Sequence, residues 1–111
     1  MAHFNLLEAQ DEFHRRFQWL RARVGGTITN CTRSTETNLR VGGNPRSQHL
    51  YGLACDLVWF GNPRTWPVER ARRLGATRGL VVIDERNRRG YRPHVHVQRY
   101  VAGYLERAMT T

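Results

Sequence analysis

Lysine is absent from this sequence, whose 18 basic residues are all arginine. Nine acidic residues oppose them, which leaves a formal net charge of +9 over 111 residues. A positive field of this size attracts polyanions of any kind, including nucleic acid and the acidic polymers of a cell envelope. A GC-rich genome, in which arginine codons replace lysine codons, would give the same composition. The charge alone therefore does not identify a partner.

Long hydrophobic runs are also missing. No stretch approaches the ~20 apolar residues that cross a bilayer, and residues 1–7 lack the basic start and apolar run of a secretory signal. We therefore expect a soluble chain made in the cytoplasm, which another factor must carry outward if its target lies outside. The hydrophobic content of 40% suffices for one core, and no repeat or linker divides the chain. We expect a single monomeric domain over residues 1–111.

Cysteine is scarce, with Cys31 and Cys55 as the two examples. Their spacing matches no zinc motif of the C-x-x-C type. Each lies in an apolar, strand-like segment, where buried and inert thiols are common. A disulfide would form if the two strands are neighbours, so both states remain open at this stage.

Apolar spacing predicts a helix early in the chain. Phe13, Phe17 and Leu20 fall at helical intervals within residues 11–24, and the glycine pair that follows would end the helix. Strands are predicted at 27–32, 54–60, 80–83 and 95–97, and further helices at 34–41, at 66–74 with Thr65 as cap, and at 100–109. The polar residues 84–93 would form a hairpin loop. This order predicts an α+β domain, with a small antiparallel sheet and flanking helices.

Three of the five histidines fall in two short clusters. His49 lies seven residues before Asp56, and His94 and His96 flank a single valine. A catalytic zinc uses about three protein ligands, commonly histidine and carboxylate, and keeps one position for water. Side chains two apart on a strand share one face, so either histidine of the second cluster could join His49 and Asp56. Two strand histidines that simply face solvent are the alternative for that second cluster alone.

A ten-residue motif connects the first cluster to a known family. It reads Ser47-x-His49-x-x-Gly52-x-Ala54-x-Asp56 and resembles the signature of the zinc D-Ala-D-Ala carboxypeptidase family. That family includes phage L-alanyl-D-glutamate endolysins and shares its fold with the hedgehog signalling domain and the murein endopeptidases. The resemblance extends to residues 32–34 and 38–43 upstream and to 94–97 downstream. It implies a hedgehog/DD-peptidase-like domain with one Zn²⁺ ion.

The resemblance also implies roles for single residues. The zinc ligands would be His49, Asp56 and His96. His94 would stay off the metal and hydrogen-bond to the activated water or the tetrahedral intermediate. Arg33 matches the arginine that binds a substrate carboxylate, a task suited to its bidentate guanidinium. Ser47 would support substrate binding through a hydrogen bond rather than act as a nucleophile, because zinc already supplies the attacking water.

One position departs from the family pattern. Most members carry an Asp or Glu as general base three residues before the last ligand, and this position is Pro93 here. A proton carrier must then come from elsewhere, since general acid–base catalysis contributes ~10²–10⁴ in rate. His94 is one candidate, and Asp84 or Glu85, at the end of the preceding strand, could assist it.

The function that the resemblance implies is hydrolysis of an amide bond in the stem peptide of bacterial peptidoglycan, by a phage-type or virion-associated lysin at the cell wall or periplasm. The basic surface could attach such an enzyme to the anionic envelope. Two alternatives remain open. One is a non-catalytic zinc domain of the same fold that binds wall peptide, which the proline at position 93 favours. The other is an arginine-rich nucleic-acid binder with Trp59, Trp66 and Tyr91 as stacking residues, which leaves the histidine clusters unexplained.

Overall fold

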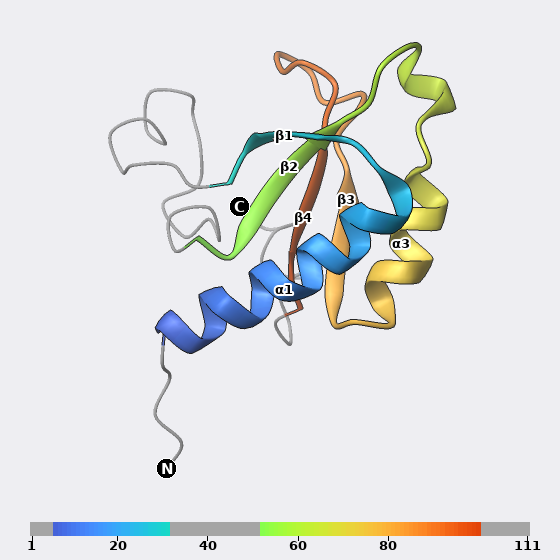
Figure 1. Ribbon diagram of the computed structural model, residues 1–111. Helices are drawn as coiled ribbons and strands as arrows, with labels where there is room; N and C mark the ends of the chain where they lie inside the picture. Colours follow the sequence, from blue (N-terminus) through green and yellow to red (C-terminus); the bar gives the residue numbers. More distant parts are fainter. Residues whose placement is uncertain (1–5, 32–51, 101–111) are drawn as a thin grey trace.

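The computed structural model describes residues 6–31 and 52–100, and Figure 1 shows how their elements are arranged. The helices are α1 (Leu6–Val24), the single-turn 3₁₀ helix η2 (Pro63–Thr65) and α3 (Val68–Ala76). The strands are β1 (Thr27–Asn30), β2 (Ala54–Val58), β3 (Leu80–Asp84) and β4 (Val95–Arg99). The predicted α+β class is therefore confirmed.

The four strands form one antiparallel sheet in the order β1-β2-β4-β3. β4 lies between β2 and β3, and its His96 pairs with Asp56 on one side and with Ile83 on the other. β1 and β3 are thus the edge strands, and β2 and β4 lie between them. This register decides which side chains share a face.

Both helices pack against one face of the sheet. The buried side of α1 presents Phe13, Phe17 and Leu20, which join a core that includes Leu57 and Val95 of the sheet. Figure 1 shows α1 in front of the strands, with α3 beside it. Because side chains alternate along a strand, the immediate neighbours of these core residues, such as Asp56 and His96, point to the opposite face.

The glycine pair after α1 ends the helix as predicted. Gly25 and Gly26 have φ values of +73° and +100°, a region that other residues rarely adopt. A Cβ on Gly26 would also lie 3.0 Å from the Trp59 ring. The indole Nε1 of Trp59 donates a hydrogen bond of 2.8 Å to the carbonyl of Val24, so it binds one of the free carbonyls at the helix end.

The predicted cap of the third helix is wrong. Thr65 belongs to η2 and donates from Oγ1 to the carbonyl of Asn62 at 2.7 Å. α3 begins only at Val68, with Pro67 at the cap position. The physical reason is the proline, because the residue before a proline is driven out of the helical region. Trp66 is accordingly extended, with φ −65° and ψ 144°.

The other boundaries differ by a few residues. α1 begins at Leu6 instead of residue 11. β1 and β2 each end two residues earlier than predicted. β3 ends one residue later than predicted, and β4 ends two residues later. The predicted helix at 34–41 lies outside the described residues, and so does 101–109, nearly all of the predicted final helix. Within residues 6–31 and 52–100, no helix is long and apolar enough to cross a membrane.

Candidate functional site

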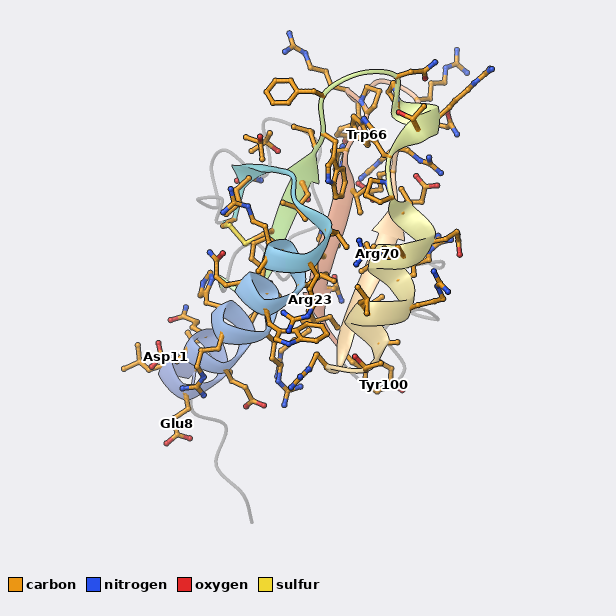
Figure 2. The ribbon with its side chains drawn as sticks, turned by 45° about the vertical axis from the view of Figure 1, so that its right-hand side comes forward. Glu8, Asp11, Arg23, Trp66, Arg70 and Tyr100 are labelled. Carbon is orange, nitrogen blue, oxygen red and sulfur yellow. A yellow bond between two sulfur atoms is a disulfide. The ribbon has the colours of Figure 1, made fainter. Side chains whose placement is uncertain are left out.

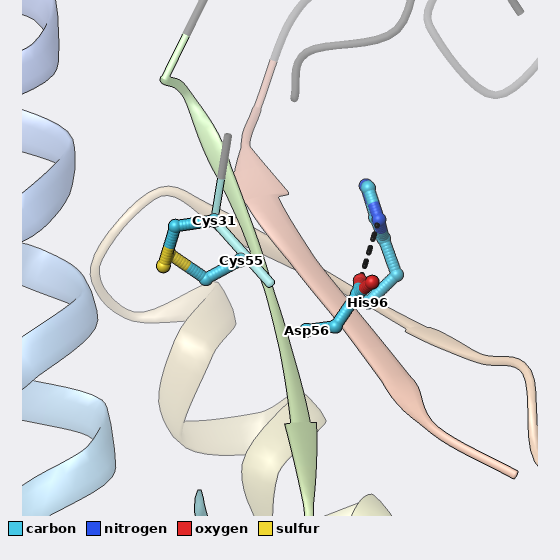
Figure 3. The surroundings of a disulfide bond; sticks show 4 residues. All are labelled: Cys31, Cys55, Asp56 and His96. Carbon is cyan, nitrogen blue, oxygen red and sulfur yellow. Dashed lines mark ion pairs between the residues drawn. A yellow bond between two sulfur atoms is a disulfide. The ribbon is translucent and has the colours of Figure 1, made fainter. Parts of the chain in front are cut away.

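Asp56 and His96 meet on the sheet face opposite the helices. They are cross-strand partners on β2 and β4. The distance from Asp56 Oδ1 to His96 Nδ1 is 3.3 Å, and the two side chains are only 15% and 10% exposed. Figure 3 shows the carboxylate directed at the imidazole ring. Two of the three ligands implied by the resemblance therefore lie side by side.

Gln98 holds the other nitrogen of the His96 ring. His96 Nε2 lies 2.7 Å from Gln98 Oε1, and the Gln98 side chain is fully buried. The Gln98 amide nitrogen also lies 3.5 Å from the carbonyl of Arg99, an acceptor that suits it. In this arrangement the amide oxygen accepts from the ring, so Nε2 carries the hydrogen. A neutral His96 then directs its lone pair, on Nδ1, at Asp56.

This arrangement fits a bound cation between Asp56 and His96. A lone pair that faces a carboxylate oxygen is unfavourable unless a proton or a metal ion lies between them. A charged N–H···O bond would usually be about 2.7–2.9 Å long, shorter than the observed 3.3 Å. Two ligands of a tetrahedral zinc ion, with bonds of about 2.0–2.2 Å, lie about 3.4 Å apart. The donor chemistry and the spacing both suit zinc.

A complete ligand set is not visible within the described ranges. Residues 6–31 and 52–100 contain no group of three or more His, Cys, Asp or Glu side chains that could hold a metal ion. His49, the third expected ligand, lies outside the described residues, and so do Arg33 and Ser47.

Glu85 and His94 form a second pair, just beyond the ends of β3 and β4. Glu85 Oε2 lies 2.5 Å from His94 Nε2, and the Glu85 amide donates to the His94 carbonyl at 3.2 Å. This pair continues the antiparallel register one step past Asp84. Since His94 is two residues before His96, and Glu85 two residues after Ile83, the pair faces the same side of the sheet as His96.

A proton is shared between Glu85 and His94. His94 Nδ1 lies 2.8 Å from the carbonyl of Arg92, which can only accept, so Nδ1 carries a hydrogen. Nε2 must then either carry a second hydrogen or receive one from Glu85, because two lone pairs cannot face each other at 2.5 Å. The pair is an imidazolium beside a carboxylate, or a neutral ring beside a carboxylic acid.

The pKa shifts of the pair agree with the charged form. The hydrogen bond that His94 donates to Glu85 raises the pKa of His94 against the effect of burial, and the Arg92 carbonyl and the charge of Asp56 act in the same direction. Burial alone would raise the pKa of Glu85, but the hydrogen bond and charge of His94, with the charge of Arg88, bring it below its usual value. Because the charge of Asp56 also raises the pKa of His94, the two pairs share one electrostatic environment.

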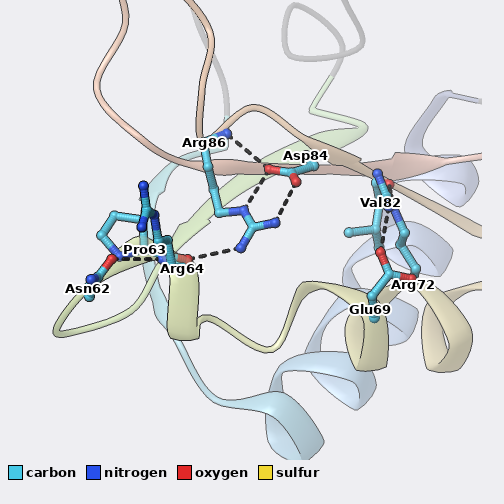
Figure 4. A network of polar contacts seen from close by, with 8 residues as sticks. All are labelled: Asn62, Pro63, Arg64, Glu69, Arg72, Val82, Asp84 and Arg86. Carbon is cyan, nitrogen blue, oxygen red and sulfur yellow. Dashed lines mark hydrogen bonds and ion pairs between the residues drawn. The ribbon is translucent and has the colours of Figure 1, made fainter.

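Asp84, the other carboxylate considered as a proton carrier, lies elsewhere. Its oxygens accept hydrogen bonds from Arg86 Nε at 2.8 Å and from Arg86 Nη2 at 2.7 Å. Arg86 Nη1 also donates a hydrogen bond to the carbonyl of Pro63 at 2.9 Å. Figure 4 shows this network on the side of η2 and α3. The guanidinium of Arg86 lowers the pKa of Asp84. Asp84 therefore ties the β3 end to η2 and is not brought to His96.

Cys31 and Cys55 form a disulfide next to this site. Cys55 is fully buried on β2 and immediately precedes Asp56, as Figure 3 shows. β1 and β2 are neighbours, which was the condition for pairing. The bond closes a covalent ring over residues 31–55, and in sequence that ring contains His49.

Two contacts of the site were not predicted from the sequence, those of Gln98 and of the Arg92 carbonyl. Gln98 has a detectable signal, because it lies two residues after His96 on the same strand and hence on the same face. The contact of Arg92 is made by a backbone atom, which carries no sequence signal.

Comparison with known proteins places the chain in a family. Searches of curated proteins and of solved structures found no significant match. The sequence profile described as peptidase M15 matches residues 7–98, most of the chain. The resemblance drawn from the histidine motifs is confirmed at this level. The chain belongs to the peptidase M15 family.

Proposed function

We propose that the chain is a zinc metallopeptidase that hydrolyses an amide bond in the stem peptide of peptidoglycan. Membership of the peptidase M15 family supports a peptidase, and members of this family are typically zinc-dependent. The observation that carries the proposal for this chain is the pair Asp56–His96, 3.3 Å apart, with the imidazole oriented by buried Gln98. That geometry suits a cation between the two side chains, which supports the proposed metal site.

The proposed metal ligands are His49, Asp56 and His96. When bound, a zinc ion supplies a Lewis acid that polarises the scissile carbonyl and makes water more acidic. Gln98 Oε1, at 2.7 Å from His96 Nε2, fixes the ring so that Nδ1 remains available as a ligand. Such outer hydrogen bonds raise the basicity of a ligating histidine and hold its orientation.

Glu85 and His94 are the proposed proton carriers. Both ring nitrogens of His94 already have partners, whereas a carboxylate offers about four lone-pair sites. Glu85 would therefore accept a proton from the attacking water, and His94 would keep Glu85 anionic and oriented. As the C–N bond breaks, the same pair would return the proton to the leaving amine nitrogen. This pair would replace the acid that Pro93 displaces.

Arg33 and Ser47 complete the proposal as substrate-binding residues. Stem peptides are rich in free carboxylates, which a guanidinium binds through two parallel hydrogen bonds. We propose the D,D-carboxypeptidase or the L-alanyl-D-glutamate endopeptidase type, acting at the wall as in a phage lysin.

The test is digestion of purified peptidoglycan by the zinc-loaded and the chelated protein, with mass spectrometry of the released fragments. Zinc should bind one to one and restore hydrolysis, and the new termini would identify the bond that is cut. Asp56→Ala and His96→Ala should each abolish tight zinc binding, while the matched controls Asp11→Ala and His14→Ala, on α1, should not. Stoichiometric zinc without hydrolysis of any wall substrate would leave the non-catalytic binding domain as the function.

A further inference from the structure

Trp19, half-buried on α1, carries two arginine side chains on its ring. The guanidinium carbon of Arg23 lies 3.9 Å from the ring centroid, and that of Arg78 lies 4.2 Å from it. The face of an aromatic ring attracts a cation, because its π electrons make the face negative. The ring therefore holds two like charges close together, one from α1 and one from the turn after α3.

Backbone carbonyls bring two more arginines to the same place. Arg16 Nη1 donates to the Arg78 carbonyl at 2.8 Å, and Arg70 Nη1 donates to the Arg23 carbonyl at 3.1 Å. Arg23 itself donates to the Trp19 carbonyl at 2.9 Å. We call Arg16, Arg23, Arg70 and Arg78 the arginine cluster. Figure 2 labels two of its members, Arg23 on α1 and Arg70 on α3.

The arginine cluster is short of negative charge. Within the described residues its one carboxylate partner is Glu12, which pairs with Arg16. A carbonyl accepts a hydrogen bond but leaves the positive charge in place, so four arginines and one glutamate give a local charge of +3. Like charges repel one another more strongly the closer they lie. The fold holds these side chains together in spite of that repulsion, and each retains unused N–H donors.

The arginine cluster lies across the sheet from the candidate site. α1 and α3 cover the face that carries Leu57 and Val95, whereas Asp56 and His96 point to the other face. A large anion bound between the helices would therefore not obstruct a substrate at His96.

We propose that the arginine cluster binds a phosphodiester polymer of the bacterial envelope. The planar fork of a guanidinium matches two phosphate oxygens at once, and a chain of phosphates can meet several arginines of the cluster together. Nucleic acid fits less well here. Proteins that bind single strands stack bases on exposed aromatic rings, and the ring of Trp19 is already covered by Arg23 and Arg78. Attachment of a wall peptidase through this surface rests on the proposed function, but phosphate binding itself does not.

The test is sedimentation of the full chain with insoluble bacterial walls, either intact or stripped of their phosphate polymer with hydrofluoric acid. All chains carry Glu85→Gln, so that the walls are not digested. The double variant Arg23→Gln/Arg78→Gln should raise the dissociation constant for intact walls about tenfold, from the loss of two charged contacts. The control Arg64→Gln/Arg89→Gln removes the same charge from exposed arginines of η2 and the 85–94 loop. It should change the dissociation constant for intact walls less than twofold. Stripped walls should bind both chains weakly.

An equal loss in the control would mean that net charge alone binds the wall, and the proposal would be rejected. Stripped walls that bind as tightly as intact walls would also overturn it, as would tighter binding of duplex DNA at the same phosphate concentration. Hydrolysis of a soluble stem peptide by Arg23→Gln/Arg78→Gln, without the Glu85 change, should match the wild type. If the wild type hydrolyses no wall substrate while this binding pattern holds, the proposed function is rejected and this inference stands.

Discussion

Glu85 Oε2 and His94 Nε2 lie 2.5 Å apart, nine residues distant in sequence, at the first position beyond the paired ends of β3 and β4. The pair shares a proton, because the other ring nitrogen of His94 donates to the Arg92 carbonyl. It also lies on the face that carries His96. We therefore propose the Glu85–His94 pair as the substitute for an acid at position 93.

The first prediction concerns Glu85→Gln, which keeps the shape and one acceptor oxygen but cannot take a proton. We expect kcat to fall by about 10²–10⁴, while zinc content stays at the wild-type level. Steady-state hydrolysis of wall fragments and metal analysis measure the two quantities. Asp84→Asn is the matched control, and its kcat should remain within a few-fold of the wild type because Asp84 is bound to Arg86. If kcat falls in Asp84→Asn but stays at the wild-type value in Glu85→Gln, the roles of the two carboxylates are reversed.

A second prediction concerns Gln98→Met, which removes the acceptor for His96 Nε2 while keeping the side-chain volume. Zinc affinity should fall about 10–100-fold, as for other losses of an outer hydrogen bond to a ligating histidine. Competition with a chromophoric chelator measures this without any reference to activity. Gln18→Met, an exposed change on α1, should leave the affinity unaltered. Unchanged affinity in Gln98→Met, in a protein that still folds, would show that Gln98 does not orient the ring.

Much of this fold follows from local patterns. The spacing of Phe13, Phe17 and Leu20 predicts the buried side of α1, and the glycine pair correctly predicts its end. The predicted start of α3 is wrong because Pro67 keeps the residue before it out of the helical region, and this effect outweighs the capping preference of Thr65.

The site needs information that local patterns do not carry. Asp84 and Glu85 are adjacent, so their side chains leave the sheet on opposite faces, and the pairing of β3 with β4 decides which one meets His94. The Cys31–Cys55 bond similarly depends on β1 and β2 being neighbours. Strand pairing is a long-range property, which explains why the sequence left both choices open.

The third prediction concerns that disulfide. The bond joins cysteines 24 residues apart, and closing such a ring in the unfolded chain corresponds to about 3.5 kcal/mol of stability. Cys31→Ser should lower the free energy of unfolding in urea by about that amount. Reduced wild type should match the variant, and a reductant should have no effect on the variant itself. If the free energy of unfolding falls by less than about 1 kcal/mol, the bond does not stabilise the protein mainly by restricting the unfolded chain.

The last prediction concerns the stability contributed by Asp84 and its dependence on pH. Arg86 lowers the pKa of Asp84 in the folded protein below its ordinary value of 3.8. A carboxyl whose pKa is lowered by folding stabilises the protein fully above its unfolded pKa, and that contribution disappears as the pH falls through the lowered, folded pKa. The pair is largely screened from solvent, with side chains 22% and 23% exposed, and Arg86 also reaches the Pro63 carbonyl.

Asp84→Asn should therefore destabilise the protein by about 1–2 kcal/mol at pH 7. The difference between wild type and variant should remain constant down to about pH 5 and then shrink toward zero in more acid solution. Urea unfolding at constant ionic strength, at several pH values between 7 and 2.5, measures this difference directly. Asp11→Asn, an exposed change on α1, should show no comparable difference at any pH. A loss in Asp84→Asn that is independent of pH would instead attribute the effect to the shape of the side chain, because a contribution from charge must vanish once the carboxylate is protonated.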